Sequence, residues 1–404
     1  MPTVWGQLRR TLIDVSTNAG SASSDLLVVG GGAIGLAIAW EAARNGRSVR
    51  ICDPDPGHGA SWVAAGMLAP INEAHFGEDD RLPVALAALN SWKSFAAEVT
   101  QATGQPIGLR EEGSIVVAYD TDDRVATDRM RLFHASLGLT ATELTIAECR
   151  KLEPWLSPDI AGGTLVEGDL SVNNRALVEA LLRANELCGV EFDRRHVSAI
   201  QLDTTGARAR GVIFDDGDHA NADVVVLAAG TWSALVQGLP AQVVPPVHPR
   251  KGQILRLRAT AEQPQPLTRS LIALVQGSNV YLVPRSNGEL VIGATQEDRG
   301  FDTSVTAGGI WELLRDARLV IPAIGEMEIG EMAAGLRPAT PDNAAIVGRT
   351  EIDGLLIATG HGRNGILFTP LTAQIINDLI EGRAPIAQAQ RLDPNRFSPT
   401  TSRR

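Results

Sequence analysis

One arginine, Arg363, stands among glycines and other small residues in the segment 358–370, ATGHGRNGILFTP. A planar guanidinium binds a carboxylate through two hydrogen bonds, which fixes both the position and the orientation of the bound group. A second arginine, Arg337, has a similarly small and apolar setting in AAGLRP. The two arginines predict a site for a small carboxylate; for Arg337 the alternative is a surface arginine after a helix end.

The residues that follow Arg363 predict a helix. Apolar side chains recur there at helical spacing, at Leu371, Ile375, Ile376, Leu379 and Ile380. Thr369 suits the cap of this helix, and Pro370 suits its first turn. We therefore expect the helix to begin near Pro370, a few residues after Arg363.

A dinucleotide-binding pattern occupies residues 25–55. A short apolar strand at 26–29 leads into G-x-G-x-x-G, formed by Gly30, Gly32 and Gly35, and a helical pattern then runs from 33 to 45. A second strand at 48–52 ends at Asp53, whose carboxylate suits ribose hydroxyls. The glycines permit close approach of a pyrophosphate to the helix N-terminus. This segment alone does not distinguish NAD from FAD.

The rest of the chain favours FAD. No regular series of strand–helix units follows Asp53, as a nicotinamide-binding domain would have. Instead, the small residues of 57–70 suit a flat ring, and two further buried strands are expected at 222–233 and 354–360. A sheet assembled from segments so far apart implies a discontinuous cofactor domain with a second domain inserted into it.

The intervening segments predict an antiparallel sheet. Residues 281–295 form two strand patterns around Asn287-Gly288, a strong hairpin signal. Further strands are expected at 113–119 and 252–259. The predicted fold is α/β (α+β overall), with a Rossmann-like FAD-binding domain and a mainly antiparallel substrate domain. The expected ranges are 1–24 for a flexible extension, 25–105, 166–240 and 331–388 for the FAD domain, 106–165 and 241–330 for the substrate domain, and 389–404 for a tail.

Composition limits the classes of partner. The 404 residues carry a formal net charge of −11, which argues against nucleic acid and anionic membranes. Cys52, Cys149 and Cys188 lack the spacing of a disulfide framework or a zinc site and suit a reducing cytoplasm. No apolar run reaches eighteen residues, so no membrane span is predicted. The seven histidines do not pair at i, i+4, and no metal site is predicted.

Four segments together carry a family resemblance: ASWVAAGMLAP, VYLVPRSNGELVIGAT, AAGLRPATPDNAAIVG and ATGHGRNGILFTP. With the dinucleotide pattern, they resemble the D-amino-acid-oxidase-like family of FAD-dependent oxidoreductases and, within it, the glycine oxidases of thiamine biosynthesis. The resemblance covers residues 25–390. It implies noncovalent FAD, since covalently flavinylated relatives use a cysteine in the C-terminal part and none follows Cys188 here.

The resemblance also implies particular site residues. Substrate contacts correspond to Arg337, Arg363 and Tyr281, although Arg363 also suits a flavin or carbonyl contact, Tyr281 an ordinary packed aromatic and His361 a structural role. The implied FAD contacts, besides the glycines above, are Ala33, Ile34, Asp53, Pro54, Ala60, Ser61, Ala65, Gly66, Met67, Val197, His361, Gly362, Arg363, Asn364, Gly365, Ile366 and Leu367. The residues before Tyr281, VQGSN, depart from the glycine-oxidase pattern, which leaves the amine specificity open.

The activity implied by the resemblance is oxidative deamination of glycine, and also of sarcosine and small D-amino acids. Hydride passes from Cα to flavin N5, water hydrolyses the imino acid to glyoxylate and ammonia, and O2 becomes H2O2. The family role is thiazole formation for thiamine, in a cytoplasmic homotetramer. The alternatives are a D-amino-acid dehydrogenase with another electron acceptor, a noncatalytic flavin-binding protein and a nicotinamide-dependent dehydrogenase.

Overall fold

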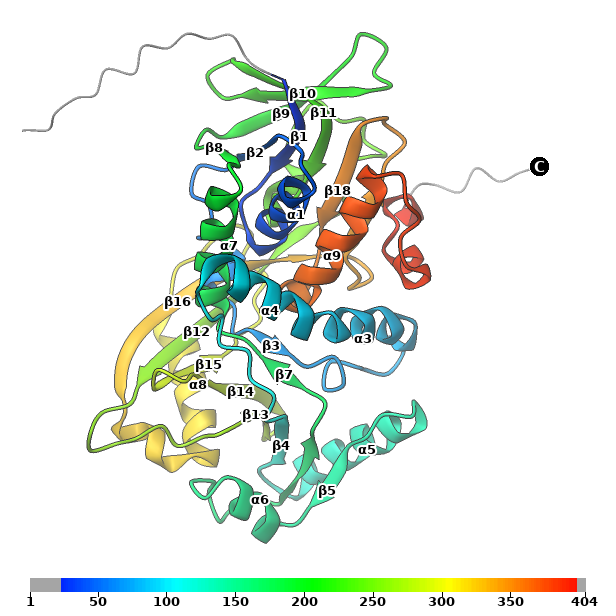
Figure 1. The fold of residues 1–404 in the computed structure, drawn as a ribbon. Coiled ribbons are helices and arrows are strands. Elements are labelled where there is room, and N and C mark those ends of the chain that lie inside the picture. The colour runs from blue at the N-terminus through cyan, green and yellow to red at the C-terminus, as the bar shows by residue number, and fades with distance from the viewer. Residues whose placement is uncertain (1–22, 398–404) are drawn as a thin grey trace, which may run out of the picture.

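The computed structural model describes residues 23–397, which form two eight-stranded sheets and a two-stranded ladder. Figure 1 shows the first sheet with its helices in the upper half of the molecule and the second sheet in the lower half. The order of the first sheet is β17 (Ile346–Arg349), β18 (Leu355–Thr359), β11 (His219–Leu227), β1 (Ser24–Val29), β2 (Val49–Cys52) and β8 (Glu191–Asp193). All these pairs are parallel except β17–β18.

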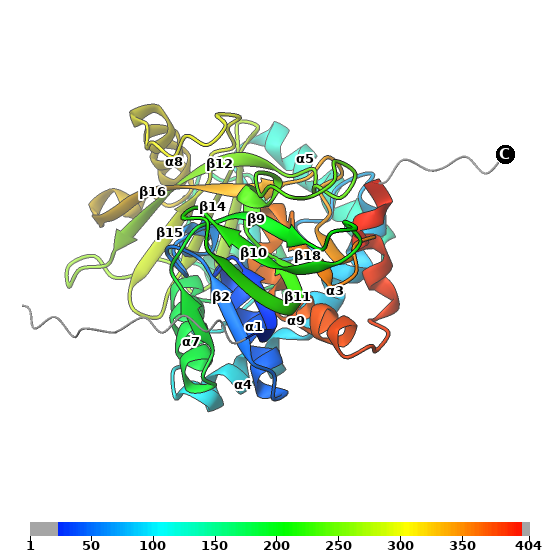
Figure 2. The same cartoon turned by 90° about the horizontal axis from the view of Figure 1, so that it is seen from above.

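Alternation along β1 places apolar side chains on both faces of the first sheet. Leu26 and Val28 join the cluster made with α1 (Ala33–Arg44), α7 (Asn174–Leu187) and α9 (Gly365–Ile380). Leu27 and Val29 join the opposite cluster, whose other members come from β11 and from β9 (Val197–Leu202) and β10 (Ala209–Phe214). Seen from above, β9 and β10 form an antiparallel ladder that continues from the first residues of β11, while the rest of β11 pairs with β1 (Figure 2).

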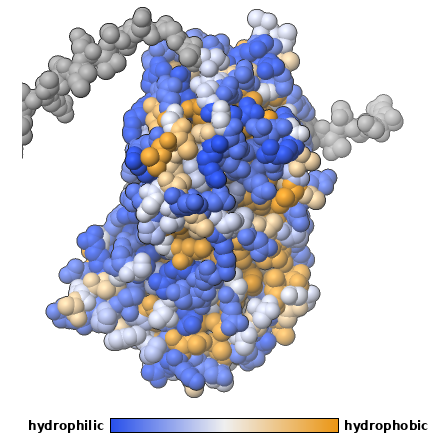
Figure 3. All heavy atoms as spheres, in the orientation of Figure 1, coloured by the Kyte–Doolittle hydropathy of each residue, from blue (hydrophilic) through white to orange (hydrophobic). Residues whose placement is uncertain are grey.

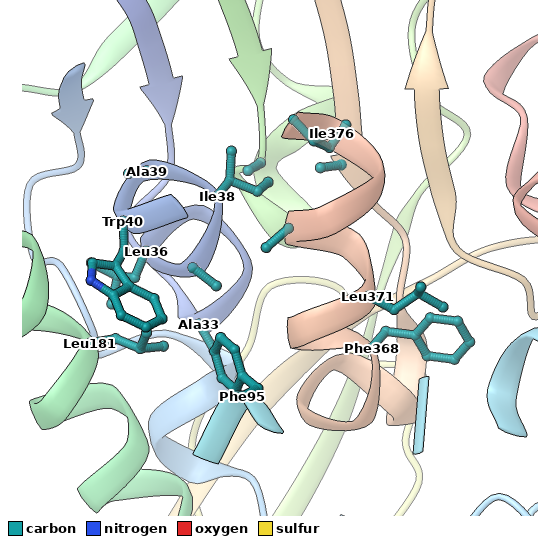
Figure 4. Close-up of a cluster of buried hydrophobic side chains, with 14 of the residues drawn as sticks. Ala33, Leu36, Ile38, Ala39, Trp40, Phe95, Leu181, Phe368, Leu371 and Ile376 are labelled. Atoms are coloured by element: carbon teal, nitrogen blue, oxygen red, sulfur yellow. The ribbon is translucent and has the colours of Figure 1, made fainter. Parts of the chain in front are cut away.

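Helices α1 and α9 pack directly against each other beneath the sheet. Figure 4 shows small and large side chains alternating in this cluster, with α4 (Trp92–Thr103) closing it at Phe95. Alanines such as Ala33 and Ala39 let the helices approach, while Leu36, Trp40 and Leu371 fill the remaining volume. The glycine turn at the start of α1 is therefore mounted on a rigid core.

The second sheet carries the other expected domain. Its order is β16 (Glu328–Ala339), β12 (His248–Arg258), β15 (Glu289–Gly293), β14 (Ser278–Pro284), β13 (Ser270–Val275), β4 (Ser114–Ala118), β6 (Gly162–Val166) and β5 (Thr142–Leu144). Only β13–β4 is parallel among these pairs in the part of the chain that the structure describes. The helices of this half are α5 (Thr121–Ser136), α6 (Ile146–Leu152) and α8 (Ala307–Val320).

Shorter elements connect the two halves. The ladder pairs β3 (Met67–Leu68) with β7 (Leu170–Ser171), after the single turn of α2 (Ala60–Val63). Helix α3 (Leu82–Asn90) precedes α4. The 3₁₀ turns are η1 (Asp79–Arg81), η2 (Gly230–Ala234), η3 (Pro322–Glu326), η4 (Gly362–Asn364), η5 (Ala387–Leu392) and η6 (Pro394–Phe397).

The structure confirms the predicted fold class and refines several details. The hairpin around Asn287-Gly288 forms as β14 and β15, and Gly288 has φ +82°. The predicted start of the last helix is wrong: α9 begins at Gly365, and Pro370 lies inside it. Thr369 donates its hydroxyl to the Gly365 carbonyl instead of capping the helix.

Two range boundaries also differ from the expectation. The FAD-domain range 331–388 begins inside β16, a strand of the second sheet. Residues 389–397, expected as part of a tail, instead pack onto the fold, with Leu392 buried and Arg396 paired with Asp342. The expected extension 1–24 lies outside the described residues up to position 22, and Ser24 already belongs to β1.

The face of the molecule seen in Figure 3 is mostly hydrophilic, with apolar residues in separate groups. Within residues 23–397, no helix is both long and apolar enough to cross a bilayer.

Candidate active site

The glycine turn between β1 and α1 approaches backbone that a side chain would exclude. Gly30 has φ +108°, and a Cβ there would lie 2.5 Å from the Ala228 carbonyl oxygen. A Cβ at Gly35 would overlap the Gly30 carbonyl. The Asp53 carboxylate accepts the Gly31 amide at 2.6 Å, so the acidic residue that follows β2 lies beside the turn.

Ser61 joins this turn to the segment that follows. Its Oγ accepts the amide of Ala33, the first residue of α1, at 3.0 Å, whereas the N-cap residue itself is Gly32, which has no side chain. Asn174, at the start of α7, donates its amide to the carbonyls of Ser61 and Trp62. Residues 60–64 remain half-exposed although elements pack around them. The segment is therefore held in place while its surface stays open to a ligand.

Buried arginines hold the same segment from the side of the second sheet. Arg285, only 3% exposed, donates to the carbonyls of Ala65 and Val172 and to the side chain of Asn174. Burial lowers the pKa of Arg285 to about 9. Arg256 reaches the Trp62 and Ala64 carbonyls and pairs with Glu289 at 2.7 Å. Cationic side chains thus lie directly beneath the backbone expected to border a flavin.

Strand β16 brings Arg337 to this region. The strand contacts both α2 and η4, and the Val63 side chain packs over Gly335, two residues before Arg337. Arg337 Nη1 donates to the Thr295 carbonyl at 3.2 Å and lies 3.5 Å from that of Lys251, which orients the guanidinium.

Tyr281 lies beside Arg337. Burial raises the pKa of the Tyr281 hydroxyl, and the nearby positive charge of Arg337 acts in the opposite direction. The phenol therefore stays protonated at neutral pH and can donate a hydrogen bond. The structure thus brings together two of the three predicted substrate residues, which come from different strands of the second sheet.

The third, Arg363, has a partner that the sequence did not reveal. Its Nε forms an ion pair with the Glu73 carboxylate, and its Nη2 donates to the Glu73 carbonyl at 3.3 Å. Glu78 lies 3.7 Å from Nη2. The side chain of Arg363 is 37% exposed, in a cleft that it shares with Glu73, Arg81 and His361.

His361 is buried beside that cleft. Burial lowers its pKa to about 3, and Nε2 hydrogen-bonds the Thr372 hydroxyl on α9 at 3.0 Å. The imidazole is therefore neutral at ordinary pH, and this contact suits a structural role.

The remaining predicted cofactor residues occupy three places. Ala65 and Gly66 lie just before β3, and Met67 is the first residue of that strand. The Gly66 carbonyl accepts the Val172 amide at 2.8 Å. Val197 opens β9 and packs in the same cluster as Cys52, the residue before Asp53. The run from Gly362 to Leu367 forms η4 and the first turn of α9, Ile34 lies in α1, and Pro54 is exposed after β2.

The sequence patterns did not point to Glu73 or to the buried Arg285. Glu73 lies in INEAHFGEDD, where an acidic side chain beside others is typical of a solvated turn. Arg285 was also missed, although a charged residue directly after an apolar strand pattern was a usable signal.

The glycine turn, the discontinuous parallel sheet and the attached antiparallel sheet define a dinucleotide-dependent oxidoreductase. Residues 25–379 match the family described as FAD dependent oxidoreductase, and the chain belongs to that family. It is accordingly an FAD-dependent enzyme, as predicted. The described residues suit FAD, because the N-cap of α1 is Gly32, so no side chain stands at the N-cap position of the helix, where a pyrophosphate would bind.

Several known proteins resemble the chain over most of its length. The glycine oxidase of Geobacillus kaustophilus is 35% identical over 88% of this chain and 93% of the relative. A crystal structure of glycine oxidase from the same organism is similar to this structure with a TM-score of 0.84 at 32% sequence identity. The match covers 93% of this chain and 99% of that chain. The iminodiacetate oxidase of Chelativorans sp. has TM-score 0.81 at 26% identity, with coverage of 91% and 98%.

A longer relative is the bifunctional protein ThiO/ThiG of Synechocystis sp., 34% identical over 94% of this chain and 55% of the relative. The chain therefore spans about half the length of such bifunctional relatives.

Proposed function

We propose that this enzyme oxidises glycine, or another small amine bearing one carboxylate, and that Arg337 and Tyr281 bind the carboxylate. The observation that carries the proposal is the meeting of these two side chains beside α2 and η4, the segments expected to border the flavin. Relatives named glycine oxidase support the choice of substrate.

The protein groups act by orientation. Arg337 holds the carboxylate in two hydrogen bonds and Tyr281 donates a third, which limits the directions in which the Cα–H bond of the substrate can point. FAD, when bound, would supply the redox chemistry by taking up the hydride of the Cα–H bond. The overall products would be H2O2, from reduction of O2, and glyoxylate with ammonia, from hydrolysis of the imino acid of glycine. We assign no acid or base to the protein.

The place of the reaction in thiazole formation for thiamine is part of the proposal, supported by the relative named ThiO/ThiG. The homotetramer and the cytoplasmic location remain predictions from the resemblance.

The test is anaerobic mixing of the purified yellow protein with glycine, sarcosine and D-alanine, followed by admission of air. Bleaching of the flavin band by glycine, with rapid recovery in air, is the expected result. Slow recovery would instead indicate a dehydrogenase with another acceptor. Absence of bleaching with all three amines would contradict the proposed substrate class.

A further inference from the structure

Arg363 is surrounded by carboxylates of its own chain. Its Nε forms an ion pair with the Glu73 carboxylate, and its Nη2 donates to the Glu73 carbonyl. The Glu78 carboxylate lies 3.7 Å from Nη2. Such a guanidinium binds a further anion only weakly, because an incoming carboxylate must first displace the carboxylate that is already paired with it.

Glu73 cannot easily move away, because both of its neighbours in the chain are tied down. Asn72 donates its amide to Asp169 and, at 2.8 Å, to Ser114. On the other side, the Ala74 carbonyl contacts Nε2 of the buried His134 at 3.1 Å. The Glu73 amide closes the turn on the Ala69 carbonyl at 3.0 Å. The fold therefore fixes the backbone from which this carboxylate extends toward Arg363.

That position is next to the substrate residues. Glu73 is close enough to Tyr281 to add to the rise in the pKa of the phenol, after the larger effect of burial. It also lines the open cleft with Arg363 and His361. Strand β16, which carries Arg337, also contacts η4, which contains Arg363, so the ion pair lies beside the strand of the proposed carboxylate-binding arginine.

We propose that Glu73 determines substrate specificity by withholding Arg363, so that amines with a single carboxylate, bound by Arg337, are favoured over dicarboxylic amines. The inference rests on the proposed function, in which Arg337 binds the first carboxylate. Removing the charge of Glu73 would leave Arg363 free to bind the second carboxylate of a diacid. A charge-assisted hydrogen bond of this kind would strengthen binding of the diacid roughly tenfold or more.

The experiment measures binding of unreactive acids through their perturbation of the visible spectrum of bound flavin. Acetate carries one carboxylate and malonate two, while succinate, which likewise has no amine, offers two carboxylates at a longer span. For Glu73→Gln we expect malonate or succinate to bind at least about tenfold more tightly than to the wild type, with acetate changed less than about threefold. The double variant Glu73→Gln/Arg363→Met should lose this gain.

The matched control is Glu78→Gln, which removes a charge on the same segment but leaves the direct Glu73–Arg363 pair intact. An equal gain in this control, a gain that persists without Arg363, or no gain for either diacid would overturn the inference. Flavin content and melting temperature verify the fold, and Glu73→Ala replaces the glutamine variant if that one does not accumulate.

Failure of the inference is distinguishable from failure of the proposed function. Bleaching by glycine is measured on the wild type alone, whereas the diacid comparison needs binding only and no turnover.

Discussion

Tyr281 and Gly293 face each other on the paired strands β14 and β15, and the phenol ring of Tyr281 occupies the space where a side chain at position 293 would begin. The absence of a Cβ at Gly293 therefore allows the tyrosine to lie across the neighbouring strand. This arrangement brings its hydroxyl to Arg337, whose own strand, β16, is separated from β15 by β12.

Gly293→Ala should displace Tyr281 and weaken binding of a carboxylate. A methyl group there overlaps the phenol, so the hydroxyl moves away from Arg337, and loss of one hydrogen bond costs about 1–2 kcal/mol, or roughly tenfold in affinity. The measurement is the dissociation constant of acetate from the flavin spectrum. Gly308→Ala, in α8 with nothing within 4 Å of the new methyl, is the control and should leave the constant unchanged. Equal constants in both variants would contradict the positioning of Tyr281 by Gly293.

Arg337→Ala should lose substrate affinity by roughly two to three orders of magnitude and still retain FAD, because removing one partner of a buried charged pair costs about 2–5 kcal/mol. The apparent affinity for glycine follows from anaerobic flavin reduction at several concentrations. Arg258→Ala, an exposed arginine at the other end of the β12–β16 pair, is the matched control. Unchanged affinity in Arg337→Ala would mean that the carboxylate binds elsewhere.

Asp169 should make the stability of the protein depend on pH. Burial raises its pKa to about 7, against the hydrogen bonds from Ser114 and Asn72 that lower it. Since the folded state then binds more protons than the unfolded state between about pH 4 and pH 7, the free energy of unfolding falls as the pH rises through that range. The total change is about 4 kcal/mol for a shift of this size.

Asp169→Asn removes this titration. The difference in the free energy of unfolding between the variant and the wild type, measured with urea at pH 5 and pH 8, should therefore shift in favour of the variant at the higher pH. A difference that is the same at both pH values would show that Asp169 does not titrate there.

Gly30→Ala should prevent FAD binding and destabilise the fold. Two effects combine at this position: the left-handed φ of +108° and the overlap of a Cβ with the Ala228 carbonyl. Gly46→Ala separates the two effects, because Gly46 has φ +86° but a Cβ there would have no atom within 4 Å. This substitution should therefore lower the free energy of unfolding by the backbone strain alone, about 1–2 kcal/mol. Urea unfolding and the flavin content of the purified variants provide the comparison. Equal destabilisation by the two substitutions would contradict the importance of the close approach at Gly30.

Local signals in the sequence predicted what depends on neighbouring residues. The alternation of Leu26 to Val29, the glycine spacing before α1 and the Asn287-Gly288 turn each reflect the conformational preference of a short segment, and the structure contains all three. The predicted start of α9 is wrong because Thr369 and Pro370 are typical of a helix start, whereas the helix begins at Gly365 and continues through the buried Pro370.

The sequence by itself determined the class of fold, the dinucleotide turn and the candidate substrate arginines, since these follow from residue type and spacing. Only the tertiary structure decided which partners those arginines have. Glu73 and Arg363 are 290 positions apart, and Arg337 meets Tyr281 through the pairing of strands in the second sheet. Such contacts depend on how distant segments pack together, and no local preference of the backbone encodes them.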